Sequence, residues 1–305
     1  MAEPQQTSPR LGIALGGGAA RGWAHLGVLR ALGEHGIEPE VVCGTSIGAL
    51  VGGFYAAGKH AELEAWVAGL TRRDVVGLLD FTMAGGGALG GRRLLELFRE
   101  HVGEVAIEAL PRRYAAVATD LHAGSEVWLQ RGSLLTAIRA SISIPGVFTP
   151  VYSGGRWLVD GGLVNPVPVS LCRALGADLV VGVDLHGGPL GSLQPRAEAE
   201  PQPAVVPDRP WRAILPWVAR AEAGAEAPAP PDVTWVITEA VTIMETRISR
   251  SRLAGDPPDL LLIPQVRDVP PLEFSGGRPT IEAGYEVAQR MAPTLRDLLG
   301  PDRAP

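Results

Sequence analysis

The stretch EVVCGTSIGALVGGFYAAG, residues 40–58, predicts the fold of the chain around it. An apolar run ends at Gly44, and a second apolar run, rich in small residues, follows Ser46. This pattern is typical of a buried strand that turns directly into a buried helix. Residues 41–58 also form a run of 18 positions without a charge, which reaches the length of a membrane-spanning helix. The five glycines in that run favour a strand, a turn and a helix instead.

Strands and helices alternate on both sides of this stretch. Residues 11–16, LGIALG, predict a buried strand, and Leu26, Leu29 and Leu32 predict a helix that ends near Gly36. This alternation implies parallel strands, so we expect an α/β fold, a three-layer α/β/α sandwich with a central, mostly parallel sheet. Further strands are predicted at residues 113–120, 125–130, 156–160, 178–184 and 259–264, and further helices at 92–101, 133–140, 168–175, 233–253 and 280–299.

The segment from Gly187 to Pro231 differs in composition from the rest of the chain. It holds ten of the 27 prolines and many alanines, so no regular core element is expected there. We predict a flexible N-terminus at residues 1–10 and one domain over residues 11–300, interrupted by this insertion at 187–231. Around Trp211 the insertion has apolar residues at helical spacing, which predict either a lid or a turn docked on the core.

Composition excludes some classes of partner. The net charge of −6 supplies no basic surface for nucleic acid. Cys43 and Cys172 stand in apolar surroundings and are predicted to be buried free thiols, which suits a reducing compartment. The first ten residues lack the apolar core of a signal peptide. We therefore expect a cytoplasmic protein, with any membrane contact peripheral and at the inner face.

Ser46 is the first candidate for catalysis. Gly44 and Gly48 flank it at the spacing of a nucleophile elbow, in which glycines avoid collisions within a tight strand-to-helix turn. The same position suits a serine that only caps the helix. The loop GGGAARG, residues 16–22, could supply backbone N–H donors for an oxyanion, with Arg21 holding the loop or adding positive charge. Its spacing does not fit a nucleotide-binding loop.

A nucleophilic serine needs a base, and two residues are candidates. His186 follows the strand predicted at 178–184, and the order Ser46, Asp160, His186 would match a triad of the α/β-hydrolase type. A histidine at the start of the insertion is more often simply solvated. Asp160 ends the strand RWLVD and leads into Gly161 and Gly162, which would let another loop approach its carboxylate. It could act as a base only if it were held beside the serine and away from water.

Three blocks in this order, GGGAARG, GTSIG and DGG, resemble the patatin-like phospholipase family. The segment RASISIPGVFTPV, residues 139–151, is similar to the apolar stretch that the family has ahead of its aspartate. The run AARGWAHLGVL most resembles the bacterial single-domain branch related to the catalytic domain of neuropathy target esterase. The resemblance covers residues 11–186 and extends past the insertion.

The resemblance implies a serine acyl hydrolase with a Ser–Asp dyad and no histidine. Ser46 would be the nucleophile and Asp160 its base, and the oxyanion hole would be formed by Gly16, Gly17, Gly18 and Ala19, with Arg21 beside it. The substrates would be phospholipids, lysophospholipids or other fatty-acyl esters, cleaved through an acyl-serine intermediate. No metal or other cofactor would be required. Besides the Ser–Asp dyad and the triad with His186, a third interpretation is a non-catalytic lipid-binding regulatory protein with the same fold.

Two positions depart from the family pattern. Ala19 stands where the family's loop usually has a second glycine, which leaves the choice of N–H donors open. Gly162 stands where some relatives have alanine, a difference that we expect to be without effect.

Overall fold

The structure, a computed structural model, describes residues 9–82, 86–187 and 233–300. Nearly all of the predicted insertion and of the predicted flexible N-terminus lie outside these residues, as does the segment around Trp211. Of the described residues, 9–82, 86–187 and 238–300 belong to one compact unit, and the description below concerns this unit together with the first turn of the helix that enters it at residue 238.

The central sheet contains eight strands within the described residues, in the order β10-β9-β1-β2-β4-β8-β7, with β5 paired to β4. Its members are β1 (Leu11–Leu15), β2 (Val41–Thr45), β4 (Arg113–Asp120), β5 (Ser125–Leu129), β7 (Val151–Ser153), β8 (Arg156–Asp160), β9 (Leu179–Val183) and β10 (Leu260–Leu262). The five strands from β10 to β4 are parallel, whereas β5, β8 and β7 pair antiparallel to their neighbours. The expected mostly parallel sheet is confirmed.

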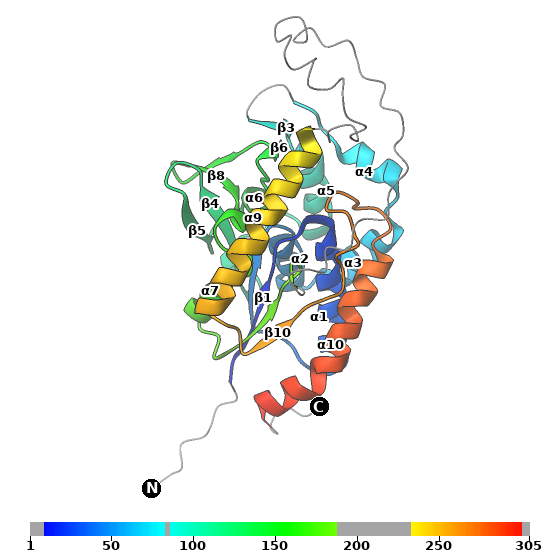
Figure 1. The fold of residues 1–305 in the computed structure, drawn as a ribbon, viewed down its shortest axis with the longest axis vertical. Helices are drawn as coiled ribbons and strands as arrows, with labels where there is room; N and C mark the ends of the chain where they lie inside the picture. The colour runs from blue at the N-terminus through cyan, green and yellow to red at the C-terminus, as the bar shows by residue number, and fades with distance from the viewer. Residues whose placement is uncertain (1–8, 83–85, 188–232, 301–305) are drawn as a thin grey trace, which may run out of the picture. The chain divides into compact units, whose positions relative to one another are not determined.

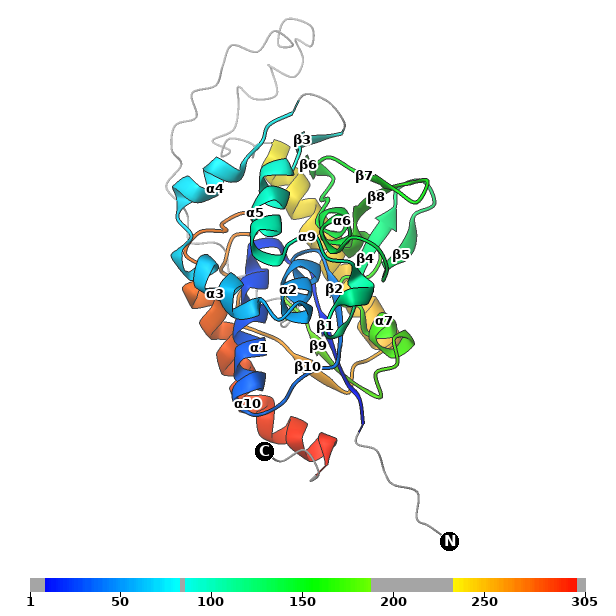
Figure 2. The same ribbon diagram turned by 180° about the vertical axis from the view of Figure 1, so that it is seen from behind.

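Helices cover both faces of this sheet. They are α1 (Ala24–Glu34), α2 (Ile47–Ala56), α3 (His60–Gly69), α4 (Arg72–Leu78), α5 (Arg92–Val102), α6 (Leu134–Ser141), α7 (Val169–Ala174), α9 (Val233–Gly255) and α10 (Arg278–Leu299). In Figure 1, α9 crosses the near face of the sheet, and in Figure 2 the helices α1, α2 and α5 lie on the opposite face. The result is the expected three-layer arrangement.

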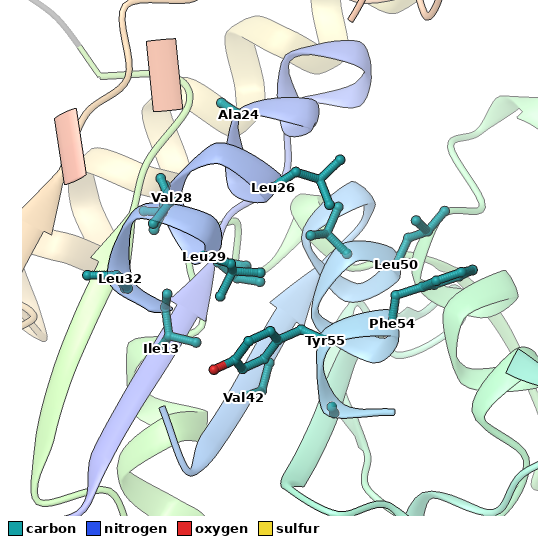
Figure 3. Packing of buried hydrophobic residues seen from close by; sticks show 14 of the residues in the cluster. Ile13, Ala24, Leu26, Val28, Leu29, Leu32, Val42, Leu50, Phe54 and Tyr55 are labelled. Atoms are coloured by element: carbon teal, nitrogen blue, oxygen red, sulfur yellow. The ribbon is translucent and has the colours of Figure 1, made fainter. Parts of the chain in front are cut away.

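The core has two parts because side chains alternate along the strands. Ile13 and Val42 point toward α1 and α2, where they share a buried cluster with Leu29 and Tyr55 (Figure 3). Ala14 and Cys43 point to the other face and pack with α7. Cys43 and Cys172 are buried free thiols, as predicted.

The uncharged run at residues 41–58 forms β2, the turn at Ser46 and α2, so it does not span a membrane. Within the described residues, no helix combines the length and the apolar character that a bilayer crossing requires. The other predicted helices and strands of the described unit are present with small differences at their ends. The helices α3 and α4 and the short strands β3 (Gly87–Leu89), β6 (Gly146–Phe148) and β7 were not anticipated.

Candidate active site

Ser46 occupies a strained turn between β2 and α2. Its φ of 55° and ψ of −126° lie in a region that non-glycine residues rarely adopt. The glycines on either side make the turn possible. A Cβ on Gly44 would lie 2.3 Å from the carbonyl oxygen of Gly48, and one on Gly48 would lie 2.1 Å from that of Leu15. The predicted elbow geometry is therefore present, and both glycines are required by close backbone contacts.

The register of β4 brings Ser46 and Asp160 together although they are far apart in sequence. β2 ends with Thr45 opposite Val117 of β4, and β8 ends with Asp160 opposite the next residue, Ala118. Because β5 pairs with the other edge of β4, β2 and β8 share the same edge, one after the other. The end of β8 therefore meets the turn that follows β2.

The two side chains make a direct hydrogen bond at this meeting point. Ser46 Oγ donates to Asp160 Oδ2 at 2.6 Å. Asp160 is fully buried, and Ser46 is only 4% exposed. The second carboxylate oxygen, Oδ1, accepts a hydrogen bond from the Gly162 amide at 2.8 Å. Both oxygens of the carboxylate are thus held, with one of them on the serine hydroxyl.

Asp160 has the electrostatic character of a base shielded from water. Burial, and after it the neighbouring Glu245 carboxylate, raise the pKa of Asp160 from 3.8 to about 8, against the opposing effects of Ser46, the Gly162 amide and His186. A carboxylate with so high a proton affinity can accept a proton from a hydroxyl much more readily than an ordinary aspartate can.

The glycine loop holds fewer free donors than the sequence led us to expect. The amides of Gly16 and Gly17 donate to the carbonyl oxygens of Val183 and Pro166 at 3.0 and 2.9 Å, so they are occupied. The amides of Gly18 and Ala19 have no acceptor within the described part of the chain, and both residues line the pocket at Ser46. The backbone amides of Gly18 and Ala19 are therefore the two remaining candidate donors to an oxyanion.

Ala19 and Arg21 shape this loop. Ala19 has a φ of 51°, which explains why glycine is the usual residue at this place in the family pattern. The Arg21 side chain donates to the carbonyl oxygens of Val269 and Arg267 at 2.9 and 3.3 Å. Arg21 thus fastens the loop to the segment after β10, which is the first of the two roles considered for it.

His186 lies close to this centre but is bonded elsewhere. It is 5% exposed, so the expectation of a solvated histidine is wrong. Its Nε2 lies 3.2 Å from Glu245 Oε2, and its Nδ1 lies 3.7 Å from Asp184 Oδ1. The Ser46 hydroxyl donates to Asp160, so nothing in this arrangement favours a triad in which His186 takes the serine proton.

Three further residues support the site and were not anticipated. His25 Nε2 contacts the Gly16 carbonyl oxygen at 2.8 Å, and burial lowers the pKa of His25 to about 4, so a neutral imidazole donates there. Ser141 Oγ accepts a hydrogen bond from the Ser46 amide at 2.8 Å, which occupies that amide. Glu245 reaches the site from α9. The sequence held no local signal for Glu245, whereas Ser141 lies in the segment 139–151 that was singled out.

The pocket at Ser46 is small and is lined by both apolar and polar residues. Its volume is about 20 Å³, which is room for about one water molecule. Apolar residues line much of it, namely Ile144, Val147, Val241, Pro271 and Leu272. Among the described residues, no group of three or more His, Cys, Asp or Glu side chains is placed to hold a metal ion, the carboxylates around His186 included.

Comparison with known proteins points to one family. The family model described as patatin-like phospholipase matches residues 13–173, more than half of the chain. An uncharacterised NTE family protein of Mycobacterium tuberculosis is 47% identical over 197 residues, 64% of this chain and 55% of the relative. Neuropathy target esterase sws of Drosophila melanogaster is 33% identical over 186 residues, 59% of this chain and 13% of that protein. The chain spans about half the length of the mycobacterial relatives that it matches at 47% identity, and less than a third of others that it matches at 37–38%.

A solved structure shares the fold. VipD from Legionella pneumophila superposes with a TM-score of 0.52 at 14% sequence identity, covering 94% of this chain and 67% of VipD. At this level of identity the likeness concerns the fold alone.

Proposed function

Because the chain belongs to the patatin-like phospholipase family, we propose that it is a serine acyl hydrolase that cleaves fatty-acyl esters with Ser46 and Asp160. The observation that carries the proposal is the 2.6 Å hydrogen bond from Ser46 Oγ to Asp160 Oδ2 in a turn that strains the serine backbone. A serine that only capped α2 would need no buried carboxylate on its hydroxyl, and its side chain makes no cap hydrogen bond to the helix.

The reaction follows from this geometry. Ser46 Oγ attacks the carbonyl carbon of the ester while its proton passes to Asp160 Oδ2, and the amides of Gly18 and Ala19 stabilise the oxyanion. The bond to the alcohol breaks, and the leaving oxygen takes the proton from Asp160. Water then gives a proton to Asp160 and attacks the acyl-serine. Ser46 leaves as the alcohol and recovers that proton.

The substrate class follows from the lining of the pocket and from the family. Apolar side chains beside Ser46 suit an acyl chain, and we propose phospholipids, lysophospholipids or related fatty-acyl esters as substrates, reached through peripheral contact with a membrane. An acyl chain is far larger than a cavity of about 20 Å³. We therefore propose that pocket residues move when substrate binds, among them Val241 and Thr242 of α9.

The test measures hydrolysis of p-nitrophenyl esters of increasing chain length and of a lysophospholipid. Ser46→Ala should lower turnover about a thousandfold or more, and Asp160→Asn should be nearly as damaging. Ser125→Ala, at an exposed position of β5, is the matched control and should be as active as the unaltered protein. A fluorophosphonate probe should label the unaltered protein at Ser46. Turnover that survives Ser46→Ala would sink the proposal, and absence of both labelling and turnover would favour the non-catalytic lipid-binding reading.

A further inference from the structure

A cluster of buried ionisable groups lies beside the Ser46–Asp160 pair. It consists of His186, 5% exposed, and three carboxylates: Asp160, Asp184 and Glu245, which are 0%, 4% and 6% exposed. Charges removed from water are costly unless they are paired. Three acids and one histidine therefore need an arrangement that limits the negative charge around Asp160.

The contacts of His186 determine its charge. Its Nε2 lies 3.2 Å from Glu245 Oε2, and its Nδ1 lies 3.7 Å from Asp184 Oδ1. Nε2 is close enough to Glu245 to donate to it, whereas Nδ1 makes no hydrogen bond among the described residues and meets Asp184 only at an ionic distance. Two carboxylates this close to the ring favour the positively charged imidazolium. Burial lowers the pKa of His186, but the contacts with Asp184 and Glu245 outweigh it and raise the pKa to about 9.

Gly162 brings Glu245 next to Asp160. A Cβ on Gly162 would lie 2.1 Å from Glu245 Oε1 and 3.2 Å from Asp160 Oδ1, so the two carboxylates flank this glycine as near neighbours. An alanine at position 162 would have to displace the Glu245 carboxylate. The Glu245 carboxylate is the end of a flexible side chain, so it can shift, and alanine at position 162 would then alter its distance from Asp160.

We propose, on the basis of the proposed hydrolase function, that Glu245 and His186 are positioning residues whose buried charges control the pH at which Asp160 can accept the Ser46 proton. Glu245, from α9, adds negative charge beside Asp160 and disfavours its ionisation. His186, as the imidazolium, partly cancels that charge and favours ionisation. The histidine thus acts on the base electrostatically and does not take the serine proton.

Other charged groups near the cluster also contribute to its electrostatic energy. Arg21, on the 3₁₀ turn η1 (Ala19–Trp23), interacts electrostatically with Glu245, and it also interacts with Glu239, Arg267 and Asp268. Asp184 stays beside His186 in any variant of Glu245. It can therefore keep a positive charge on the imidazole when Glu245 is neutralised.

The first test measures kcat/KM against pH for the unaltered protein, Glu245→Gln and His186→Gln. Activity should rise with pH as Asp160 ionises. Glu245→Gln removes a negative neighbour and should move the midpoint of this rise down by about one pH unit. His186→Gln removes a positive neighbour and should move it up by about half a unit to one unit. Below the midpoint, a shift of one unit changes the rate about tenfold at fixed pH.

The midpoint shifts in opposite directions in the two variants, and this distinguishes the proposal from a purely structural role and from a histidine base. A purely structural role would lower activity at all pH values without moving the midpoint, and a histidine base would make His186→Gln inactive throughout. Glu282→Gln, at a side chain 56% exposed on α10, and His122→Gln, in an exposed turn, are controls that should leave the midpoint unchanged. Thermal unfolding verifies that each variant is folded. Midpoints that shift in the same direction, or no more than in the controls, overturn the proposal.

A second test does not depend on turnover. NMR of the protein with labelled histidine, with His186 identified by its loss in His186→Gln, should find its imidazole protonated at pH 7.5 and titrating near pH 9. In Glu245→Gln the titration should move to lower pH. A neutral His186 at pH 7.5 overturns the proposal, whether or not the protein hydrolyses esters. A failure of the hydrolase function itself would appear separately, as turnover unaffected by Ser46→Ala.

Discussion

Replacement of Gly48 by alanine tests whether the turn at Ser46 depends on backbone contact between α2 and β1. The added Cβ would lie 2.1 Å from the carbonyl oxygen of Leu15 and 2.7 Å from that of Gly16. Both are backbone atoms, so no side chain can rotate to relieve the overlap. Carbon and carbonyl oxygen normally approach to about 3.3 Å, so the start of α2 must move away from β1 by about 1 Å.

The cost can be worked out from burial. All ten residues of α2 are buried, so its displacement disturbs a packed core on every side. Overpacking of this kind costs about 1–3 kcal/mol, whereas the gain from replacing a helical glycine by alanine is about 0.5–1 kcal/mol. We expect a net loss of about 1–2 kcal/mol, and at about 2–4 °C per kcal/mol a fall in Tm of about 2–8 °C.

Gly33→Ala is the matched control, because it makes the same change near the end of α1, where a Cβ would find no atom within 4 Å. It should gain about 0.5–1 kcal/mol and raise Tm. The assay is thermal unfolding followed by circular dichroism, together with the rate at which a fluorophosphonate labels Ser46, which should fall only in Gly48→Ala. A Gly48→Ala protein that is stabilised as much as Gly33→Ala would refute the reasoning.

Three further predictions concern buried ionisable groups. Burial is the main cause that raises the pKa of Asp160 from 3.8 to about 8, so the unaltered protein loses stability as pH rises from 3.8 to about 8. Asp160→Asn has no such loss. The Tm of this variant, measured relative to the unaltered protein, should therefore increase over this pH interval and stay constant above it. Burial lowers the pKa of His25 from 6.5 to about 4, so the protein loses stability as pH falls from 6.5 to about 4. In urea unfolding, His25→Gln should lose less stability over this pH interval than the unaltered protein. Arg139 is 5% exposed and donates to Ser143 and to backbone oxygens. Arg139→Met should therefore lower the free energy of unfolding in urea by about 2–4 kcal/mol. The control Arg131→Met, at an exposed position, should lower it by less than about 0.5 kcal/mol.

Each of these has a distinct contrary result. A Tm difference for Asp160→Asn that does not vary with pH would contradict burial as the cause of its raised pKa. An acid loss that is unchanged in His25→Gln would mean that another group titrates. Equal losses in the two arginine variants would show that the bonds of the buried guanidinium contribute nothing.

Some elements escaped prediction for identifiable reasons. The strands β3, β6 and β7 have three residues each, too few for a clear alternating pattern. β3 and β6 also pair with each other over a long separation in sequence, whereas β7 forms a local hairpin with β8. For α4 a local signal existed, because Thr71 and Asp74 form a capping box at its start. The helix has no buried residue and therefore no clear apolar periodicity, so the capping box is the one local signal that predicts it.

The sequence alone determined the features that depend on short-range sterics. Gly44 and Gly48 follow the rule that a tight strand-to-helix turn leaves no room for a Cβ, so the elbow and the candidate nucleophile could be predicted from seven consecutive residues. The alternation of apolar segments likewise determined the parallel part of the sheet, because each segment must bury its own apolar face.

Only the tertiary structure decided which charged groups meet at Ser46. The register of β4 places Asp160 against the serine, and α9 brings Glu245 to Gly162 and His186. His186 reads in the sequence as a solvated residue, yet it is buried between two carboxylates. The physical reason is that electrostatic interactions depend on distance through space and on exclusion of water. Neither quantity is encoded in the neighbours of a residue along the chain.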